Sequence, residues 1–474
     1  MAPQSRRVWS LSRACALAGL ALLALLPVRA ARANGNHTHI GITLMAIELL
    51  PPGPLRELLG AADVRQMLVN GTIFPDGGYA IQHEYGETAH WEPFQRALAA
   101  RIRKQCPDPL ASQACREKAA FLFGMASHGM ADQVFDALYM AAAKVHDAAN
   151  WSDGLTDSFD SSTDVLWVAA RGGIEPPERW LPMDDLLATF TAVGVSVPAT
   201  TIEDGQAILL TAVLGFGNVS GRNPKKVQEA KARYPWGAAH LLDAHTPGSP
   251  PSEARVVASY WLQLWSEWKD GAPARQEVLA TMPGDGGHIG SASAPDNVLA
   301  VVFSRGLDSK SLDAGKLSVT PVGATAPHPT SLNLFYGQSS HVVRVLPSEP
   351  WPQGPLTLAW QSGLCSSFDG VPSLTGGAVT VQVGAHDPQA PPSALPGAPP
   401  ASWSLHVEAT KVPAQPNDGG ATDGGAAGND ATGGCSAAPN GRNHAEPLDL
   451  LAPMACVLLV LLGIRTRSGC WSAD

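Results

Sequence analysis

The segment "EKAAFLFGMASHGMADQVFDALYMAAAKV", residues 117–145, combines a long apolar pattern with three polar side chains of metal-binding type. Its apolar residues recur at intervals of three and four, which predicts a helix. His128, Asp132 and Asp136 follow one another at intervals of four, so a helix places them on one face. Buried carboxylates are costly unless they are paired or bind a cation. The segment therefore fits a metal site and, equally well, a hydrated polar stripe on an amphipathic helix.

The composition is that of a folded, acidic protein with room for more than one domain. The 474 residues are 45% hydrophobic and carry a formal net charge of -10. This charge gives no basic surface for duplex nucleic acid. A metal site binds phosphate without a lysine-rich surface, so monomeric or single-stranded phosphodiesters remain possible substrates.

Both ends of the chain have the composition of targeting segments. Three arginines, the apolar run "ACALAGLALLALLPV" and the small residues of "RAARA" predict a signal peptide over residues 1–33. A Pro- and Gly-rich linker is expected over residues 385–434. Residues 435–474 contain Cys435, the charge-free run 450–464 and two arginines, an order that resembles the C-terminal sorting tags of myxobacterial-type surface proteins. The alternative is a simple tail anchor. We expect a secreted protein retained at the cell surface or outer membrane through this segment.

Two cysteines lie in a short loop-like segment, "QCPDPLASQACREK". Because export leads to an oxidising compartment, we predict a disulfide between Cys106 and Cys115. The alternative is two unrelated buried thiols.

Between the targeting segments, the composition of the sequence and the spacing of its apolar residues change near residue 290. Helical spacing recurs in "THIGITLMAIELL" and "ARVVASYWLQLWSEW", which predicts a mainly α domain over residues 34–285. The runs "NVLAVVFS", "KLSVTPV", "SHVVRVLP", "GPLTLAW" and "GAVTVQV" are short, β-prone and separated by Gly and Pro. They predict a small all-β sandwich of immunoglobulin type over residues 293–384. The predicted fold class is thus multidomain, mainly α and then all-β.

Several further segments supply nitrogen and carboxylate ligands. These are His37 and His39 in "NHTHIGITL", Asp76, His83 and His90 in "FPDGGYAIQHEYGETAHW", and Asp153, Asp157, Asp160 and Asp164 in "SDGLTDSFDSSTDV". Each segment alone also fits a structural histidine or a solvated acidic stripe. Together they provide enough ligands for more than one zinc ion.

The order of these segments resembles the zinc-dependent phospholipase C family, most closely the catalytic domains of its glycosylphosphatidylinositol-specific phospholipases D. The resemblance spans about residues 37–200 and rests on "THIGITLMAIELL", "GTIFPDGG", "HEYGETAHWEPF" and "AFLFGMASHGMAD". It implies two or three zinc ions held by His39, Asp76, His90, His128, Asp132, Asp136 and Asp160.

The resemblance also implies catalytic roles and contains departures. Asp76 is a candidate general base, and His83 is a candidate for orienting substrate, although it could instead cap a loop. Thr156 stands where the family has a histidine, so Asp157 or Asp164 is a possible replacement ligand. Asp136 also stands in place of a histidine, an exchange that zinc tolerates.

The function that the resemblance implies is a secreted zinc-dependent hydrolase of phospholipase C or D type. It would cleave phospholipids or lipid-linked phosphoryl groups at a membrane surface, with metal-activated water. One alternative is a single-strand nuclease of the S1/P1 kind, for which Tyr79, Tyr85 and Trp91 would supply stacking aromatics. Another is a non-catalytic surface-binding protein. Because the helical part contains all of the expected ligands, hydrolysis of a soluble substrate is expected to survive removal of the β-sandwich.

Overall fold

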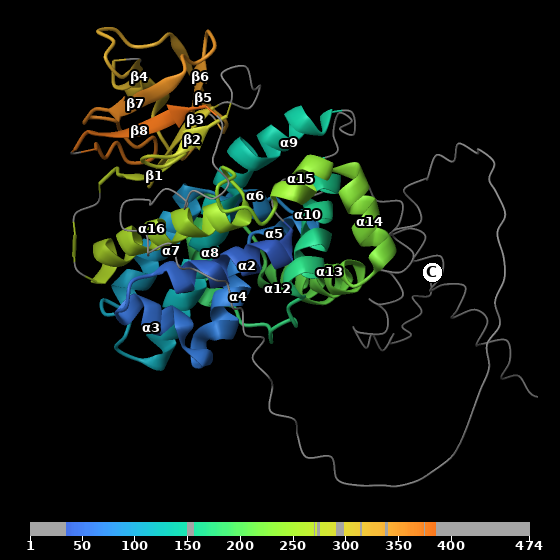
Figure 1. Ribbon diagram of the computed structural model, residues 1–474. Coiled ribbons are helices and arrows are strands. Elements are labelled where there is room, and N and C mark those ends of the chain that lie inside the picture. Colours follow the sequence, from blue (N-terminus) through green and yellow to red (C-terminus); the bar gives the residue numbers. More distant parts are fainter. Residues whose placement is uncertain are drawn as a thin grey trace, which may run out of the picture. The chain divides into compact units, whose positions relative to one another are not determined.

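A computed structural model describes residues 35–148, 156–269, 271–272, 275–290, 298–312, 315–336, 340–373 and 375–384 (Figure 1). These residues belong to one compact unit, Pro27–Ala401. Helices occupy residues 36–269, called the helical region below, and strands occupy residues 278–383, called the β region. The predicted signal peptide, the linker and the C-terminal segment lie outside the described residues. Among the described residues, no helix has the length and apolar character needed to cross a membrane.

The helical region contains helices of very different lengths. The first are α2 (Asn36–Leu49), α3 (Pro54–Gly60), the 3₁₀ turn η1 (Ala62–Val64), α4 (Arg65–Ile73), α5 (Asp76–Ala80), α6 (Tyr85–His90) and α7 (Glu92–Gln105). The long α8 (Gln113–Val134) continues into the π-helical segment η2 (Phe135–Met140) and α9 (Ala141–His146). The remaining ones are α10 (Thr156–Arg171), α11 (Met183–Ala192), α12 (Ala199–Ile208), the π-helical η4 (Leu209–Val213), α13 (Leu214–Gly221), α14 (Pro224–Arg233), α15 (Pro235–His240) and α16 (Pro250–Lys269).

Two glycines bring α4 and α8 into backbone contact. A Cβ atom at Gly71 would lie 2.0 Å from a carbonyl oxygen of α8, and one at Gly124 would lie 2.1 Å from a carbonyl oxygen of α4. Real Cβ atoms do not approach so closely, so only glycine permits this crossing. Asp76 follows α4 by three residues and His128 lies one turn beyond Gly124. The crossing therefore determines how far apart these two side chains stand.

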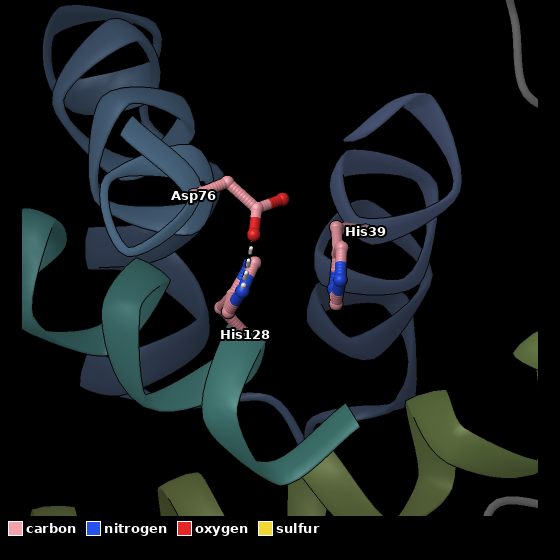
Figure 2. Close-up of side chains that lie close together, drawn as sticks. All are labelled: His39, Asp76 and His128. Carbon is pink, nitrogen blue, oxygen red and sulfur yellow. Dashed lines mark ion pairs between the residues drawn. The ribbon is translucent and has the colours of Figure 1, made fainter. Parts of the chain in front are cut away.

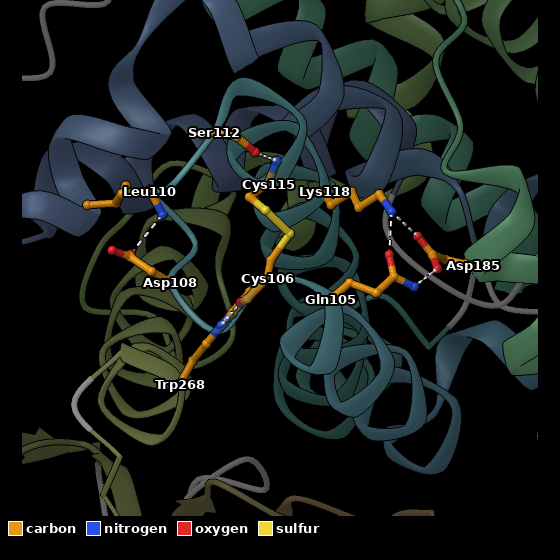
Figure 3. Close-up of a disulfide and its surroundings, with 9 residues drawn as sticks. All are labelled: Gln105, Cys106, Asp108, Leu110, Ser112, Cys115, Lys118, Asp185 and Trp268. Atoms are coloured by element: carbon orange, nitrogen blue, oxygen red, sulfur yellow. Dashed lines mark hydrogen bonds and ion pairs between the residues drawn. A yellow bond between two sulfur atoms is a disulfide. The ribbon is translucent and has the colours of Figure 1, made fainter.

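A disulfide joins the end of α7 to the first turn of α8 (Figure 3). It links Cys106 and Cys115, as predicted from the sequence. The Ser112 hydroxyl accepts the N–H of Cys115 at 3.2 Å and so caps α8. The indole N–H of Trp268, in α16, donates to the carbonyl of Cys106 at 3.0 Å. The junction of α7 and α8 is thus fixed covalently and also held to α16.

The β region consists of two four-stranded sheets. One has the order β1 (Val278–Met282), β3 (Leu299–Phe303), β6 (Val342–Pro347), β5 (Thr330–Leu334) and is antiparallel throughout. The other has the order β2 (His288–Ile289), β8 (Gly377–Val383), β7 (Gly354–Trp360), β4 (Leu317–Pro321), with β2 parallel to β8 and the other pairs antiparallel. The short 3₁₀ turn η5 (Ser309–Ser311) lies between β3 and β4.

The two sheets share one hydrophobic core built from alternate residues of their strands. Leu299, Val301 and Phe303 of β3 contribute to it, as do Val379 and Val381 of β8. The intervening residues of β3 are buried as well, which shows that the other face of this strand is also covered. The residues that face the shared core thus follow the period of two along each strand.

The five strands predicted from the sequence are present as β3, β4, β6, β7 and β8. The sequence did not indicate β1, β2 and β5. The strands begin before residue 293, since β1 and β2 precede it and pair with β3 and β8. The edge strand β5 contains no buried residue, so its composition lacks the apolar signal of the other strands.

Candidate metal centre

Four helices bring imidazoles and carboxylates together in the interior of the helical region. His39 comes from α2, Asp76 from α5, His90 from α6, and His128 and Asp132 from α8. All five side chains are buried. Figure 2 shows His39, Asp76 and His128 facing one another from separate helices. The five residues are those on which the sequence resemblance depends most.

Four ligand atoms from these residues lie close together, and five of the six distances between them approach those of a tetrahedral metal site. His128 Nε2 lies 3.0 Å from His90 Nε2, 3.2 Å from Asp132 Oδ2 and 3.7 Å from Asp76 Oδ1. His90 Nε2 lies 3.3 Å from Asp76 Oδ1 and 3.6 Å from Asp132 Oδ2. Ligands bound tetrahedrally to zinc at about 2.1 Å stand about 3.4 Å apart, because a tetrahedron's edge is about 1.6 times its centre-to-corner distance. These five distances therefore differ by less than about 0.5 Å from those around one tetrahedral zinc ion.

His39 lies beside this set and makes a second group. His39 Nε2 is 2.9 Å from Asp132 Oδ1, and the His39 ring stacks on that of His128 with centroids 3.9 Å apart. One ligand atom from each of His39, Asp76 and His128 also lies within 4.8 Å of the other two. Asp132 thus presents one oxygen toward His90 and His128 and the other toward His39. A carboxylate in this position is suited to bridge two cations.

Unsatisfied buried polar atoms support the same conclusion. Both ring nitrogens of His39, Nδ1 of His128, Oδ1 of Asp76 and both carboxylate oxygens of Asp132 are buried and make no well-oriented hydrogen bond, although several of them lie within ion-pair distance of one another. Buried polar atoms in folded proteins are nearly always hydrogen-bonded, and each one left unsatisfied costs free energy. Their concentration among imidazoles and carboxylates fits a bound cation, which would satisfy lone pairs on several of these atoms at once.

His90 is held in the orientation and tautomer that a metal ligand requires. Its Nδ1–H donates to the carbonyl of Gly86, one turn earlier in α6, so Nε2 keeps its lone pair. The carbonyl of His90 accepts a hydrogen bond of 2.8 Å from the side chain of Gln95. Such outer contacts fix the ring of a ligating histidine and raise its basicity.

The surroundings shift the pKa of Asp76 and Asp132 in the opposite direction from that of Asp136. Burial alone would raise the pKa of Asp132, but His128 and His39 outweigh it and lower that pKa. The pKa of Asp76 is lowered in the same way, against burial, by His128, His90 and His39. Burial and the charge of Asp132 instead raise the pKa of Asp136 well above its ordinary value. The surroundings therefore favour the anionic form of Asp76 and Asp132 and disfavour that of Asp136.

Asp136 and Asp160 are buried but stand outside the two closely spaced groups of the described residues. Asp136 lies in η2, directly after α8, and the hydroxyl of Tyr336 from the β region donates to its Oδ2. Asp160 lies in α10, and its charge is one of those that raise the pKa of Tyr336. Of these two expected ligands, Asp136 is thus in direct contact with the β region.

Asp164 was a possible metal ligand from the sequence, but in the structure its carboxylate contacts another helix. Its Oδ1 accepts the N–H of Thr38 at 2.9 Å and its hydroxyl at 3.2 Å, while its Oδ2 lies 3.0 Å from His37 Nδ1. Both oxygens are thus engaged at the N-terminus of α2, where Asp164 acts as a helix cap supplied by α10. The side chain of Asp157 and the whole of Asp153 lie outside the described part of the chain.

His83 makes a local contact at the start of α6. Its Nδ1 accepts the N–H of Tyr85 at 3.1 Å, which is the loop-capping role left open by the sequence. Tyr336, in contrast, was not indicated by the sequence at all. It lies 200 residues after Asp136 in a loop after β5, and no spacing pattern connects the two.

Comparison with known proteins gives one partial similarity. No family model matches the chain. Over 111 residues it is 33% identical to phosphatidylinositol-glycan-specific phospholipase D from Bos taurus, a match that covers 21% of this chain and 12% of that protein. The chain thus matches only a small part of this relative's length.

The similarity to solved structures is too weak to indicate a fold. The methionine-rich copper resistance protein PcoC from Escherichia coli is 23% identical, with a TM-score of 0.19 over 23% of this chain and 99% of that one. The surface-layer protein SbsC is 12% identical, with a TM-score of 0.18 over 69% of this chain and 46% of that one. These TM-scores are too low to indicate a shared fold.

Proposed function

We propose that this protein is a zinc-dependent phosphodiesterase that hydrolyses phospholipids or lipid-linked phosphoryl groups. The observation that carries the proposal is the near-tetrahedral spacing of ligand atoms from Asp76, His90, His128 and Asp132 in a buried position. The partial identity with a phospholipase D that acts on phosphatidylinositol-glycan supports this substrate class.

The residues present fit zinc better than calcium or magnesium. Imidazole nitrogen combined with carboxylate oxygen is a donor set that zinc prefers, whereas calcium and magnesium favour oxygen ligands alone. When bound, zinc withdraws charge from phosphoryl oxygens and makes water a stronger nucleophile near neutral pH. We propose two or three ions, with Asp132 shared between them.

The chain's own residues prepare the site for an anionic phosphodiester. His90 is oriented by Gly86, and Asp132 keeps its two oxygens directed at separate histidines. Asp76 Oδ1 lies 3.3 Å from His90 Nε2 and 3.7 Å from His128 Nε2, so we propose that Asp76 is a metal ligand.

We also propose the biological setting that the sequence suggests. In this proposal the signal peptide directs the chain out of the cytoplasm, and residues 435–474 retain it at the cell surface. The enzyme then meets its substrate at a membrane surface. We propose further that the two sheets form an immunoglobulin-type sandwich.

A single-strand nuclease is the second candidate, because aromatic rings border the site. The Tyr79 ring lies 4.7 Å from that of His90, and the Trp91 ring lies 4.8 Å from that of Tyr336. Tyr85, which the sequence also suggested for stacking, is fully buried, whereas Tyr79, Trp91 and Tyr336 are partly exposed. Rings in such positions are suited to stack on nucleotide bases.

The test is metal analysis combined with hydrolysis assays on the full chain. We expect two or three zinc ions per chain and hydrolysis of phosphatidylinositol vesicles and of a soluble bis(nitrophenyl) phosphate. Asp132→Asn should lower activity by more than about 100-fold, the upper range for residues that only support a ligand. The exposed Asp184→Asn serves as a matched control and should behave as wild type.

Each outcome separates the alternatives. Protein that holds no zinc after exposure to zinc would refute the metal centre. Protein that holds zinc without cleaving any phosphodiester would be a metal-containing binding protein instead. Preferential cleavage of single-stranded DNA would favour the nuclease.

A further inference from the structure

We propose that Tyr336, a residue of the β region, is a positioning residue of the metal centre in the helical region. Its hydroxyl holds one oxygen of Asp136, so that the other oxygen stays available to a cation. The centre is then a composite of both regions. This inference rests on the proposed function, since it concerns the same site.

The contact between the two side chains has the geometry of an oriented ligand. The Tyr336 hydroxyl donates to Oδ2 of Asp136, whose side chain is only 1% exposed. Oδ1 of Asp136 is buried and has no hydrogen-bond partner. One oxygen is therefore fixed and the other is open, as in metal-binding carboxylates that are oriented by an outer hydrogen bond.

The phenol of Tyr336 is in direct contact with one carboxylate of the site, that of Asp136. The charges of Asp136, Asp132 and Asp160 all act on Tyr336, and together with burial they raise its pKa. A phenol is protonated near neutral pH, so in this contact Tyr336 is the donor and the carboxylate of Asp136 the acceptor. Through its hydrogen bond to Asp136, Tyr336 links the β region to the site.

The β region is also attached to the segment that carries His90. The ring of Tyr336 lies 4.8 Å from that of Trp91, the next residue in the chain. The backbone N–H of Gly306, after β3, donates to Glu92 Oε2 at 2.7 Å. Three consecutive residues, 90–92, thus belong to the metal centre and to the contact with the β region.

Buried charges and a backbone contact hold the two regions together at the same place. Arg305 is 2% exposed and donates to Glu267 of α16 at 3.1 Å. Arg96 of α7 also pairs with Glu267, at 2.8 Å. The N–H of His341, near the start of β6, donates at 3.2 Å to Gln133, the residue after Asp132. The segment before β6 is therefore anchored close to α8, and Tyr336 lies five residues before His341.

These contacts change what is expected when the β region is removed. The sequence placed the whole ligand set in the helical part and suggested that soluble-substrate hydrolysis would survive. If Tyr336 orients Asp136, the helical region alone loses this support, and its zinc affinity falls.

The test uses Tyr336→Phe in the full chain, which removes one hydroxyl and keeps the ring against Trp91. Zinc dissociation constants are measured by chelator competition, and the site is observed through the visible spectrum of the cobalt-substituted protein. We expect the zinc ion that depends on Asp136, identified as the one lost in Asp136→Asn, to bind about 10- to 100-fold more weakly. The cobalt bands should shift, because the coordination changes.

Tyr139→Phe is a matched control. The Tyr139 hydroxyl donates to the carbonyl of Gly237, so the variant also removes one buried phenolic hydrogen bond, but one that involves no carboxylate. Its zinc affinity and cobalt spectrum should equal those of wild type. In Asp136→Asn, adding Tyr336→Phe should cause no further loss, because both changes act on the same ion.

The possible results distinguish the two proposals. Wild-type protein without zinc would refute the proposed function. Wild-type zinc binding combined with an unchanged affinity and spectrum in Tyr336→Phe would overturn this inference alone. So would independent, additive losses from the two variants, or full zinc content in Asp136→Asn.

Discussion

Asp164→Ala should destabilise the start of α2 and loosen the position of His39. The carboxylate of Asp164 caps α2 through the N–H and hydroxyl of Thr38, and its other oxygen lies against His37 Nδ1. His37 and Thr38 are fully buried, so water cannot replace the lost partner. His39 follows in the same turn and depends on where this turn begins.

The expected loss of unfolding free energy follows from these contacts. Loss of a helix cap costs about 1 kcal/mol. Leaving a buried imidazole nitrogen without its partner costs about 2 kcal/mol more. The unfolding free energy should therefore fall by about 3 kcal/mol. At about 2–4 °C per kcal/mol for a region of this size, the Tm should fall by about 6–12 °C.

Calorimetry with and without a chelator is the assay, and Asp164→Asn is the matched variant. Asparagine keeps a carbonyl oxygen for Thr38, so it should lose less stability than alanine. The loss should persist in metal-free protein, because the cap does not involve a cation. A Tm within 2 °C of wild type, roughly the effect of less than 1 kcal/mol, would refute the capping argument. A loss seen only with zinc would show that Asp164 is a metal ligand.

Two further predictions concern the fold. Burial alone would raise the pKa of Asp185, but Lys118, Gln105 and Arg101 together lower it. Its stabilising effect is then present above its unfolded pKa of about 3.9 and is lost as pH falls through the lower folded value. In urea denaturation, Asp185→Asn should cost about 2 kcal/mol at pH 7 and much less near pH 2; equal costs at both pH values would contradict this reasoning. Gly124→Ala should push α4 from α8, lowering both the Tm and zinc affinity, and unchanged values would show that the crossing relaxes freely.

The central part of the site was predictable because it follows helical spacing. His128 and Asp132 are four residues apart on one long helix, and their apolar neighbours predicted that this face is buried. His39, Asp76 and His90 were found through short motifs, each beside a helix start or a glycine pair. The structure brings all five together.

Contacts between distant segments were not predictable in the same way. Asp164 was read as a possible ligand because an acid at this spacing looks the same whether it binds a cation or caps another helix. Tyr336 lies beside an exposed edge strand, where neither hydrophobic alternation nor a motif marks it. In both cases the partner residue depends on how whole helices and strands pack together. A local sequence pattern carries no information on that packing.

The backbone contact between α4 and α8 has a consequence for how the site tolerates change. Side chains normally form a compressible layer between helices, and substitutions in that layer alter the distance between them by small amounts. At Gly71 and Gly124 this layer is absent, so main chain rests on main chain. The separation of Asp76 and His128 should then stay constant while the surrounding core drifts in sequence. Selection for a metal ion of another size would have to act on the ligands themselves or on these two glycines.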